Sequence, residues 1–299
     1  MAITIPEAYI QTFESRVRHL AQQGDTLLRN TVSVVNDQSK SHNWDRLAAS
    51  AARVKPNVRA VSPAGGDGSG AIDTTDGLVW SRRNSLIQTY DWGEIVASEE
   101  ANQMLIDPYS SVAMNGSMAM KRSTDDVIIA AATGDAGDGK GGVVSFPAGQ
   151  LLGDGTAAMS YTTLLDILQL FAENDIDPSE EKTLVIGPVQ QRQLLAEEQV
   201  TSGDYQTIKA LTQGYVPNGL MGFARVIVSN RLSSGVGTLS CLAYTSKAIG
   251  LHIAGDLRAN VAPRPDMSFE TQFYLQHDIA AVRVEDEHIV HINVLDSIA

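Results

Sequence analysis

The chain has 299 residues, of which 43% are hydrophobic and 19% charged, and its formal net charge is −13. This is the composition of a folded protein with a sizeable core, and the acidic balance argues against a protein that grips phosphate backbones, which needs clustered Lys and Arg. No apolar run approaches the roughly 20 residues of a membrane span, so we expect no membrane association.

Cysteine and histidine usage narrows the class further. The single cysteine, Cys241, excludes an internal disulfide and suits a reducing cytoplasm, and six scattered histidines argue against a structural zinc site. The first 16 residues lack a basic region followed by an apolar core, so no signal peptide is expected.

The charge is unevenly distributed along the chain. Residues 1–90 hold ten Lys and Arg against eight Asp and Glu, which leaves −15 for the remainder. This asymmetry is explained either by solvation alone or by complementary surfaces that meet between copies of the chain, and the sequence does not choose between them.

The chain opens with a predicted amphipathic helix at residues 6–23, followed by a predicted strand at residues 31–35. The helix presents one apolar face, formed by Ile10, Phe13, Val17 and Leu20. A terminal helix of this kind must dock either on its own core or on that of a neighbour.

From residue 38 to about residue 83 small and polar residues dominate, with the glycine-rich stretch SPAGGDGSG at residues 62–70. Strand-like pieces flank this stretch at residues 54–61 and 77–81, and the whole is too long for an ordinary connection inside a compact domain. It is either a flexible linker or a two-stranded arm that lies on another subunit. We expect the arm.

A long helix is predicted after a short one at residues 97–106. Asp107 is placed as its N-cap, Pro108 as its first residue, and Gly134 as a left-handed C-terminal residue. With no proline between, the helix would be roughly 35–40 Å long. It could be a core helix of an ordinary enzyme. One stripe is small or apolar and allows close backbone approach: Ala113, Gly116, Met120, Val127 and Ala131.

The segment GDAGDGKGG at residues 134–142 matches the G-x-x-x-x-G-K part of a phosphate loop. However, Gly141 stands where Ser or Thr would hold magnesium, and the segment follows a helix and precedes a strand, which is the reverse of the required order. We therefore expect a hairpin or loop here, followed by a strand at residues 143–146.

Residues 147–264 are predicted to form a mixed α/β unit that ends at Pro263 and Pro265. Its helices are expected at residues 161–174, with Leu164, Leu165, Leu168 and Phe171 on one face, and at residues 189–198; its strands are expected at residues 183–186, 223–228 and 239–244. Cys241 lies in the last of these strands and is interpreted as a buried structural thiol.

Three strands are predicted at the C-terminus, at residues 269–276, 279–284 and 288–294, with a turn at residues 285–287. His288 and His291 would then lie on opposite faces of a strand, which excludes a shared metal ion and favours exposed imidazoles. Asp125 and Asp126 are adjacent on a helix and cannot form a carboxylate pair. No catalytic, cofactor-binding or metal-binding constellation is predicted, although active sites need not be local in sequence.

Three blocks of this sequence resemble tailed-phage major capsid proteins of the Hong Kong 97-type fold. They are IDPYSSVAMNGSMAMKRSTDDVIIAAATG, QRQLLAEEQVTSGDYQTIKALTQGYVPNGLMGFARVIVSNRL and RPDMSFETQFYLQHDIAAVRVEDEHIVHI, and their order and spacing agree from about residue 85 to the C-terminus. Residues 1–84 match in layout only.

The resemblance implies an α+β capsid fold divided as follows: N-terminal arm 1–37, extended β-hairpin loop (E-loop) 38–90, peripheral domain 91–146 with spine helix 108–133, axial domain 147–264, and C-terminal strands of the peripheral domain 265–299. It implies a non-enzymatic subunit of the icosahedral head, self-assembled as hexamers and pentamers in a bacterial cytoplasm, enclosing double-stranded DNA without specific binding. A separate scaffolding protein and a portal would be partners, decoration proteins are a further option, and no covalent crosslink is assumed.

Two hypotheses about residues follow. Basic residues of the arm are expected to face Asp or Glu of an adjacent copy: Arg46, Arg53, Lys55, Arg59, Arg82 and Arg83. Gly116 and Met120 are expected at the close-packed face of the spine helix. Because no long charged helical segment precedes the first helix, we also expect an unprocessed subunit. The alternatives are an encapsulin-type compartment shell and a soluble enzyme.

Overall fold

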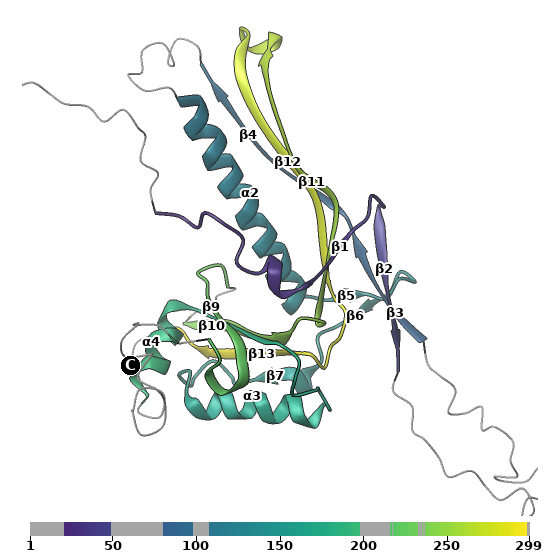
Figure 1. Ribbon diagram of the computed structural model, residues 1–299, viewed down its shortest axis with the longest axis vertical. Helices are drawn as coiled ribbons and strands as arrows, with labels where there is room; N and C mark the ends of the chain where they lie inside the picture. Colours follow the sequence, from purple (N-terminus) through teal and green to yellow (C-terminus); the bar gives the residue numbers. More distant parts are fainter. Residues whose placement is uncertain are drawn as a thin grey trace, which may run out of the picture.

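The computed structural model describes residues 21–48, 80–97, 108–197, 218–232 and 237–297, together with Val216 and Gly235. These residues mix helices and strands, as expected for an α+β fold (Figure 1). The helices are α2 (Pro108–Thr133), α3 (Tyr161–Glu173) and α4 (Pro188–Ala196), with 3₁₀ turns η1 (Arg29–Thr31), η4 (Ala148–Gln150), η5 (Leu220–Gly222) and η6 (Pro265–Met267). The strands are β1 (Ser33–Asn36), β2 (Ser41–Leu47), β3 (Trp80–Leu86), β4 (Gln88–Val96), β5 (Ala136–Gly137), β6 (Val143–Val144), β7 (Leu151–Leu152), β8 (Lys182–Ile186), β9 (Phe223–Val228), β10 (Thr238–Thr245), β11 (Ile249–Arg264), β12 (Glu270–Arg283) and β13 (Ile289–Leu295).

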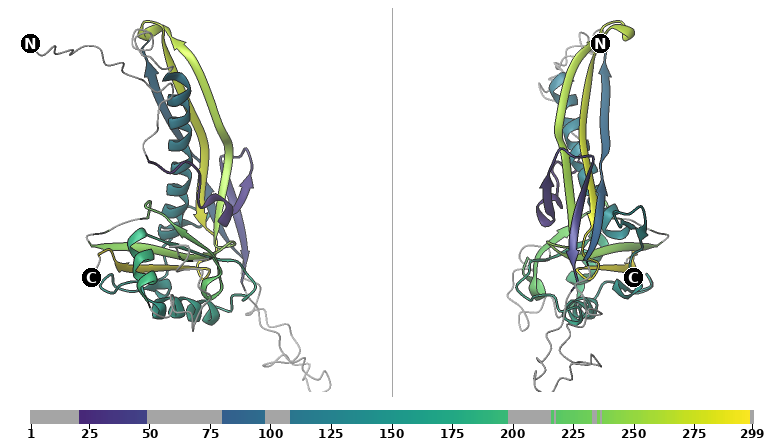
Figure 2. Two further views of the ribbon diagram at one scale, coloured as in Figure 1. Left: turned by 60° about the vertical axis from the view of Figure 1, so that its left-hand side comes forward. Right: turned by 90° about the vertical axis from the view of Figure 1, so that its right-hand side faces the viewer.

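The described strands form three sheets, ordered β1-β11-β12-β4, β7-β13-β10-β8-β9 and β2-β3-β5-β6. In the first sheet β11 and β12 form a long antiparallel hairpin, with β4 antiparallel to β12 and β1 parallel to the start of β11. Helix α2 lies along this sheet, and together they form an elongated body (Figures 1 and 2). We call this body the long layer and the five-stranded sheet with α3 and α4 the compact unit.

Helix α2 has the bounds predicted for the spine helix, residues 108–133. The predicted N-cap, Asp107, and the predicted helix at residues 97–106 lie outside the described residues, apart from residue 97, which is not helical. The left-handed conformation predicted for Gly134 is wrong. Gly134 instead continues the helical pattern by donating its N–H to the Ala130 carbonyl at 2.9 Å, and a Cβ there would lie 2.7 Å from that oxygen.

Close packing of α2 on the long layer depends on Gly116. This residue is buried, and a Cβ placed on it would lie 2.4 Å from the Trp92 ring of β4 and 2.8 Å from Leu275 Cδ1 of β12. Met120, one turn further along, is also buried. The missing side chain therefore lets the indole lie directly against the helix backbone.

The compact unit contains most of the apolar core. Ser160 caps α3 by accepting a hydrogen bond from the Thr163 N–H, and the helix buries Leu164, Ile167 and Phe171 against the sheet. Leu165, which was predicted on this face, is 45% exposed, because Ile167 and not Leu165 lies on the buried face with Leu164 and Phe171. Strand β8 is buried at all five positions, and its apolar residues, Leu184 to Ile186, lie in the core of the compact unit.

The observed sheets differ from the predicted division of the chain. Strand β11, assigned by sequence to residues 147–264, belongs to the long layer because it pairs with β12 along its length. Strand β13, assigned to the C-terminal strands of the other domain, pairs with β10 in the compact unit. Pro263 and Pro265 therefore lie at the tip of the β11–β12 hairpin.

Strands β4 and β11 were not predicted, because each carries signals that argue against a strand. Gly255 interrupts β11, where the pairing with β12 shifts register, and Pro263 lies near its end. Strand β4 has polar residues on both faces and gains order from its nine pairs with β12. The two strands predicted at residues 269–276 and 279–284 are one continuous strand, β12.

The N-terminal segment enters along α2. Residues 1–20 lie outside the described residues, and residues 21–23 of the predicted helix are not helical. Buried Asp125 of α2 accepts hydrogen bonds from the N–H groups of Leu27 at 2.9 Å and Leu28 at 3.1 Å. Burial raises the pKa of this carboxyl, and the two N–H groups oppose that rise. Asp126 points elsewhere, to Arg231, so the two aspartates do not form a pair, as predicted.

We expect Gly116→Leu to destabilise the chain by about 1–3 kcal/mol, because the new side chain must displace Trp92 or separate α2 from the sheet. Chemical denaturation of the isolated subunit measures this loss. Gly149→Leu is the control, since a Cβ at Gly149 meets nothing within 4 Å and its φ is not positive. Equal stability of the two variants would contradict the close contact at Gly116.

We also expect stability to fall between about pH 7.5 and 5.5, with His277 contributing to the fall. Burial between α2 and β12, where Nε2 lies 3.1 Å from Ser123 Oγ, lowers the pKa of His277 in the folded state. The unfolded chain therefore binds a proton first, and stability decreases as pH falls below the unfolded pKa. Between these pH values, the melting temperature of His277→Gln should fall less with decreasing pH than the melting temperature of the parent. An unchanged pH slope would show that His277 does not contribute.

Candidate assembly arm and its anchoring site

The arm predicted from sequence has a two-stranded base. Strands β2 and β3 pair antiparallel from Ser41 opposite Leu86 to Leu47 opposite Trp80, and they lead away from the rest of the chain (Figure 1). Residues 49–79, with the glycine-rich stretch and the predicted strand at 54–61, lie outside the described residues. The confirmed part of the prediction is thus the paired base.

Two arginines of the arm base point to the turn between β12 and β13. Arg83 Nη2 lies 2.6 Å from Asp286 Oδ2, and the side chain is only 6% exposed. Arg46 Nη2 lies 3.1 Å from Glu285 Oε2 and 3.6 Å from Glu287 Oε2. Acidic side chains at three successive positions thus hold two adjacent strands of the arm.

A third arginine, Arg283, is completely buried beneath this turn. Its Nε donates to Asp286 Oδ1 at 2.6 Å, so one carboxylate binds Arg83 and Arg283 through different oxygens. Its Nη1 donates to the Gly134 carbonyl at 2.5 Å, and Nη2 donates to the Val144 and Ser145 carbonyls. A buried charge needs such partners. We call Arg283, Asp286 and Arg83 with these contacts the node; it connects the end of α2, β6 and β12 to the arm.

The apolar part of the anchor is Trp44 of β2. Its ring packs with Ala136, Val282 and Val284. A Cβ at Gly250 of β11 would lie only 2.4 Å from the indole, so that glycine makes room for it. The ring of His42 contacts Trp44 edge-on at 4.9 Å between centroids. The arm base is therefore docked on its own chain by packing as well as by charge.

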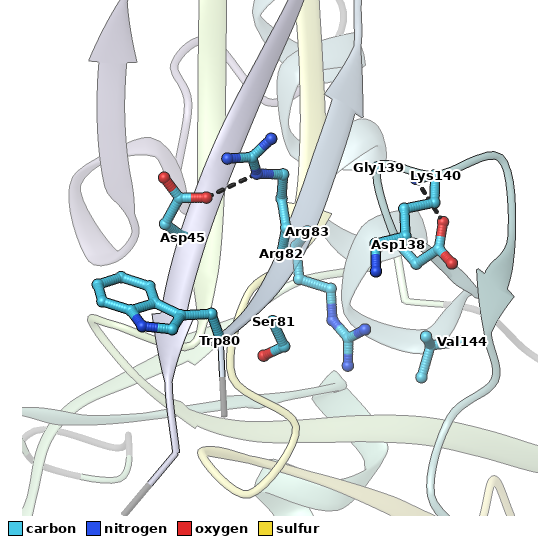
Figure 3. Close-up of a pocket in the computed structure, with 9 residues that line it drawn as sticks. All are labelled: Asp45, Trp80, Ser81, Arg82, Arg83, Asp138, Gly139, Lys140 and Val144. Carbon is cyan, nitrogen blue, oxygen red and sulfur yellow. Dashed lines mark hydrogen bonds and ion pairs between the residues drawn. The ribbon is translucent and has the colours of Figure 1, made fainter. Parts of the chain in front are cut away.

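These contacts place two of the predicted basic arm residues beside acidic groups of their own chain. The acidic partners of Arg46 and Arg83 lie more than 200 residues later in the same chain, and contact of these arginines with an adjacent copy stays a prediction. Arg82 pairs with Asp45 across its own hairpin and stays half exposed (Figure 3). The remaining three residues lie outside the described residues: Arg53, Lys55 and Arg59.

Arg283 and the acidic turn were not predicted to bind the arm, although both had a signal in the sequence. The segment RVEDE places Arg283 three residues before Asp286 within an apolar strand, where a charge needs a local partner. The basic excess of residues 1–90 left two explanations open, solvation alone or contact between copies. Contact with the acidic turn at residues 285–287 of the same chain was not considered.

Among the described residues, no group of three or more His, Cys, Asp or Glu side chains could hold a metal ion. Cys241 is buried, and burial raises the pKa of its thiol to about 12, which disfavours the reactive thiolate and agrees with a structural thiol. The segment at residues 134–142 forms the predicted hairpin, β5–β6, and not a phosphate loop. Among the described helices, none has both the length and the apolar character to cross a bilayer.

The histidines predicted on an exposed face are partly buried instead. His288 Nδ1 lies 2.7 Å from Thr245 Oγ1 and 3.5 Å from Glu180 Oε2. His291 contacts the Phe146 ring, and burial lowers the pKa of its imidazole. Both belong to the compact unit because β13 is inserted in its sheet, and neither is part of a metal-binding group among the residues described.

Comparison with solved structures defines the fold. The capsid protein of cyanophage P-SCSP1u superimposes with a TM-score of 0.72 at 14% identity, covering 99% of this chain and 96% of that chain. A chain of Mycobacterium phage Che8 gives 0.69 at 14% identity, with coverages of 97% and 98%. The capsid of Ralstonia phage GP4 gives 0.69 at 13% identity, with coverages of 98% and 96%. The fold is therefore the Hong Kong 97-type fold of tailed-phage capsid proteins, as predicted.

A family model described as phage capsid protein matches residues 5–296. The chain belongs to this family and is a major capsid protein, a structural component of the virion. No curated protein sequence matches the chain. The alternative of an encapsulin-type compartment finds no support in the family or structural matches.

We expect Arg283→Met to cost about 3–5 kcal/mol, because it removes the buried charge that Asp286 and three carbonyls surround. Chemical denaturation of the subunit measures the loss. Arg264→Met is the matched control, since it breaks only the exposed pair with Asp266 and should leave the denaturation midpoint unchanged. If Arg283→Met does not fold, Asp286→Asn, which weakens the same node, should still be less stable than the control. Variants as stable as the control would contradict the role of the node.

Proposed function

We propose that the chain is the repeating subunit of a closed icosahedral head shell, arranged in hexamers and pentamers around double-stranded DNA. The observation that carries this proposal is the arm, whose base is fixed by buried ion pairs and whose strands lead away from the body. An element with a fixed base and strands that lead away from the body is suited to contact a neighbour. Repeated weak contacts of this kind become strong together in a closed lattice.

The role proposed for the chain is structural and not enzymatic. The net charge of −13 suits a wall that encloses DNA without adhering to it. Assembly would take place in the cytoplasm of a bacterial host, in line with a single cysteine, with a scaffolding protein and a portal as partners. Decoration proteins on the outer surface remain a further partner class.

Contacts between copies are proposed for the outer part of the arm. With Arg46 and Arg83 already neutralised within the chain, the cations left for a neighbour are Arg53, Lys55 and Arg59, together with half-exposed Arg82. Residues 91–299 carry −15, which supplies acidic partners on an adjacent copy. Each exposed pair would contribute only about 0–1 kcal/mol, and repetition across the lattice would make the sum effective.

Electron microscopy of the purified chain should show closed particles, and deletion of residues 63–70 should impair closure while the subunit stays folded. A variant with residues 63–70 replaced by a flexible linker of equal length separates the effect of length from that of composition. High salt should weaken early assembly more than it weakens the folded subunit. If the deletion variant unfolds, or assembles as well as the parent at every salt concentration, the arm is an intramolecular loop.

A further inference from the structure

The dipeptide Asn–Gly occurs twice in the chain, as Asn115–Gly116 and as Asn218–Gly219. In this dipeptide the backbone nitrogen of glycine can attack the side-chain carbonyl carbon of asparagine, because glycine has no Cβ to hinder the approach. The new C–N bond closes a succinimide ring, the bond to the amide nitrogen breaks, and ammonia leaves. Water then opens the ring to aspartate or to isoaspartate. Since both dipeptides have the same chemistry, the fold decides which of them reacts.

Asn218 and Gly219 lie in an exposed turn that leads into η5. Gly219 has a φ of 87°, in the left-handed region, and a Cβ placed on it would meet nothing within 4 Å. The space around the glycine is therefore open to water and to base, and ring closure displaces no packed neighbour.

The amide of Asn218 is held in a way that favours attack on it. Its Oδ1 accepts a hydrogen bond from the Val226 N–H of β9 at 2.9 Å. This donor polarises the side-chain carbonyl and faces the oxygen on which negative charge develops when the Gly219 nitrogen attacks, so it stabilises the tetrahedral intermediate. The Gly219 N–H donates to the Phe223 carbonyl at 2.8 Å. That bond must open before attack, and opening is easiest at an exposed turn.

The other dipeptide, Asn115–Gly116, lies in the interior of α2. The side chain of Asn115 is exposed, but the N–H of Gly116 belongs to the helical hydrogen-bond ladder. Gly116 is also buried directly beneath the Trp92 ring. Ring closure at this position would require α2 to unwind where it packs on the sheet, so the fold protects Asn115.

We propose that Asn218 is a site of spontaneous deamidation in the folded protein, with the Gly219 nitrogen as nucleophile and water as co-reactant. Each event replaces a neutral amide with a carboxylate, which adds a negative charge to a chain whose net charge is already −13. The isoaspartate product also lengthens the main chain by a methylene shortly before β9, an edge strand of the compact unit (Figure 1). The site belongs to the single subunit, so the reaction does not depend on the proposed shell.

Peptide mapping by mass spectrometry compares the two dipeptides within one protein. Folded protein and protein unfolded in denaturant are incubated side by side at mildly alkaline pH and digested, and the fraction of acid at each asparagine is followed with time. In the unfolded chain the two should react at similar rates. In the folded protein Asn218 should react within a few-fold of its unfolded rate, whereas Asn115 should react at least about tenfold more slowly than its own, because α2 must open first. Equal protection of both by folding would overturn the proposal.

Isoaspartate gives an independent readout, because it arises only when a succinimide ring opens. An isoaspartyl methyltransferase with labelled S-adenosylmethionine should methylate the aged, folded protein. Asn218→Gln, whose longer side chain closes a less favourable ring, should remove most of this methylation, and Asn115→Gln is the matched control that should leave it unchanged. Methylation that persists in Asn218→Gln would overturn the assignment of the site. Aspartate formed without isoaspartate would overturn the role of Gly219 as the nucleophile.

The two products should differ in their effect on β9. Aspartate keeps an oxygen acceptor for the Val226 N–H, so in Asn218→Asp this amide should exchange with solvent as in the parent. Isoaspartate shifts the carboxylate relative to the main chain, so in the isoaspartate fraction of aged protein the Val226 amide should exchange severalfold faster. Equal exchange in the two forms would overturn the proposed effect on β9.

Discussion

The carboxylate of Asp286 holds the molecule together at the point where its parts meet. One oxygen binds buried Arg283 and the other binds Arg83 of the arm. Arg283 in turn satisfies carbonyls at the end of α2 and in β6 and its flank. Removing one partner from this group lowers the stability of the fold strongly, because the remaining charge stays buried without compensation. The group therefore favours this one arrangement of the elements even where its net contribution to stability is small.

The position of this node follows from the path of the chain. Residues 245–249 lead from the compact unit into β11, and residues 283–289 lead back from β12 into β13, with the Val284 N–H donating to the Ala248 carbonyl at 2.8 Å. Helix α2 ends at the same place, where Gly134 accepts from Arg283. The long layer, the compact unit and the arm thus share one junction, although none of them shares a sheet with another.

Local sequence signals predicted several helices and strands correctly. They did not predict which distant segments of the chain pair with one another. The bounds of α2 and β9 and the buried character of β8 could be predicted because proline, glycine and short runs of apolar residues are local signals. Strand β4 is polar and is ordered by pairing with β12, which begins more than 170 residues later, so its own composition gave no strand signal. The partners of Arg46 and Arg83 were assigned to another molecule for the same reason: sequence showed complementary charge but not which copies of it would meet.

The way the arm is attached also determines how force would pass through the molecule. Tension applied along β2 and β3 is transmitted by Arg46 and Arg83 to residues 285–287, which lie between a strand of the long layer and a strand of the compact unit. A pull on the arm is therefore divided between both parts of the subunit instead of peeling one strand from a sheet edge. Because the load falls on two arginines and three successive acidic residues, no single contact carries it alone.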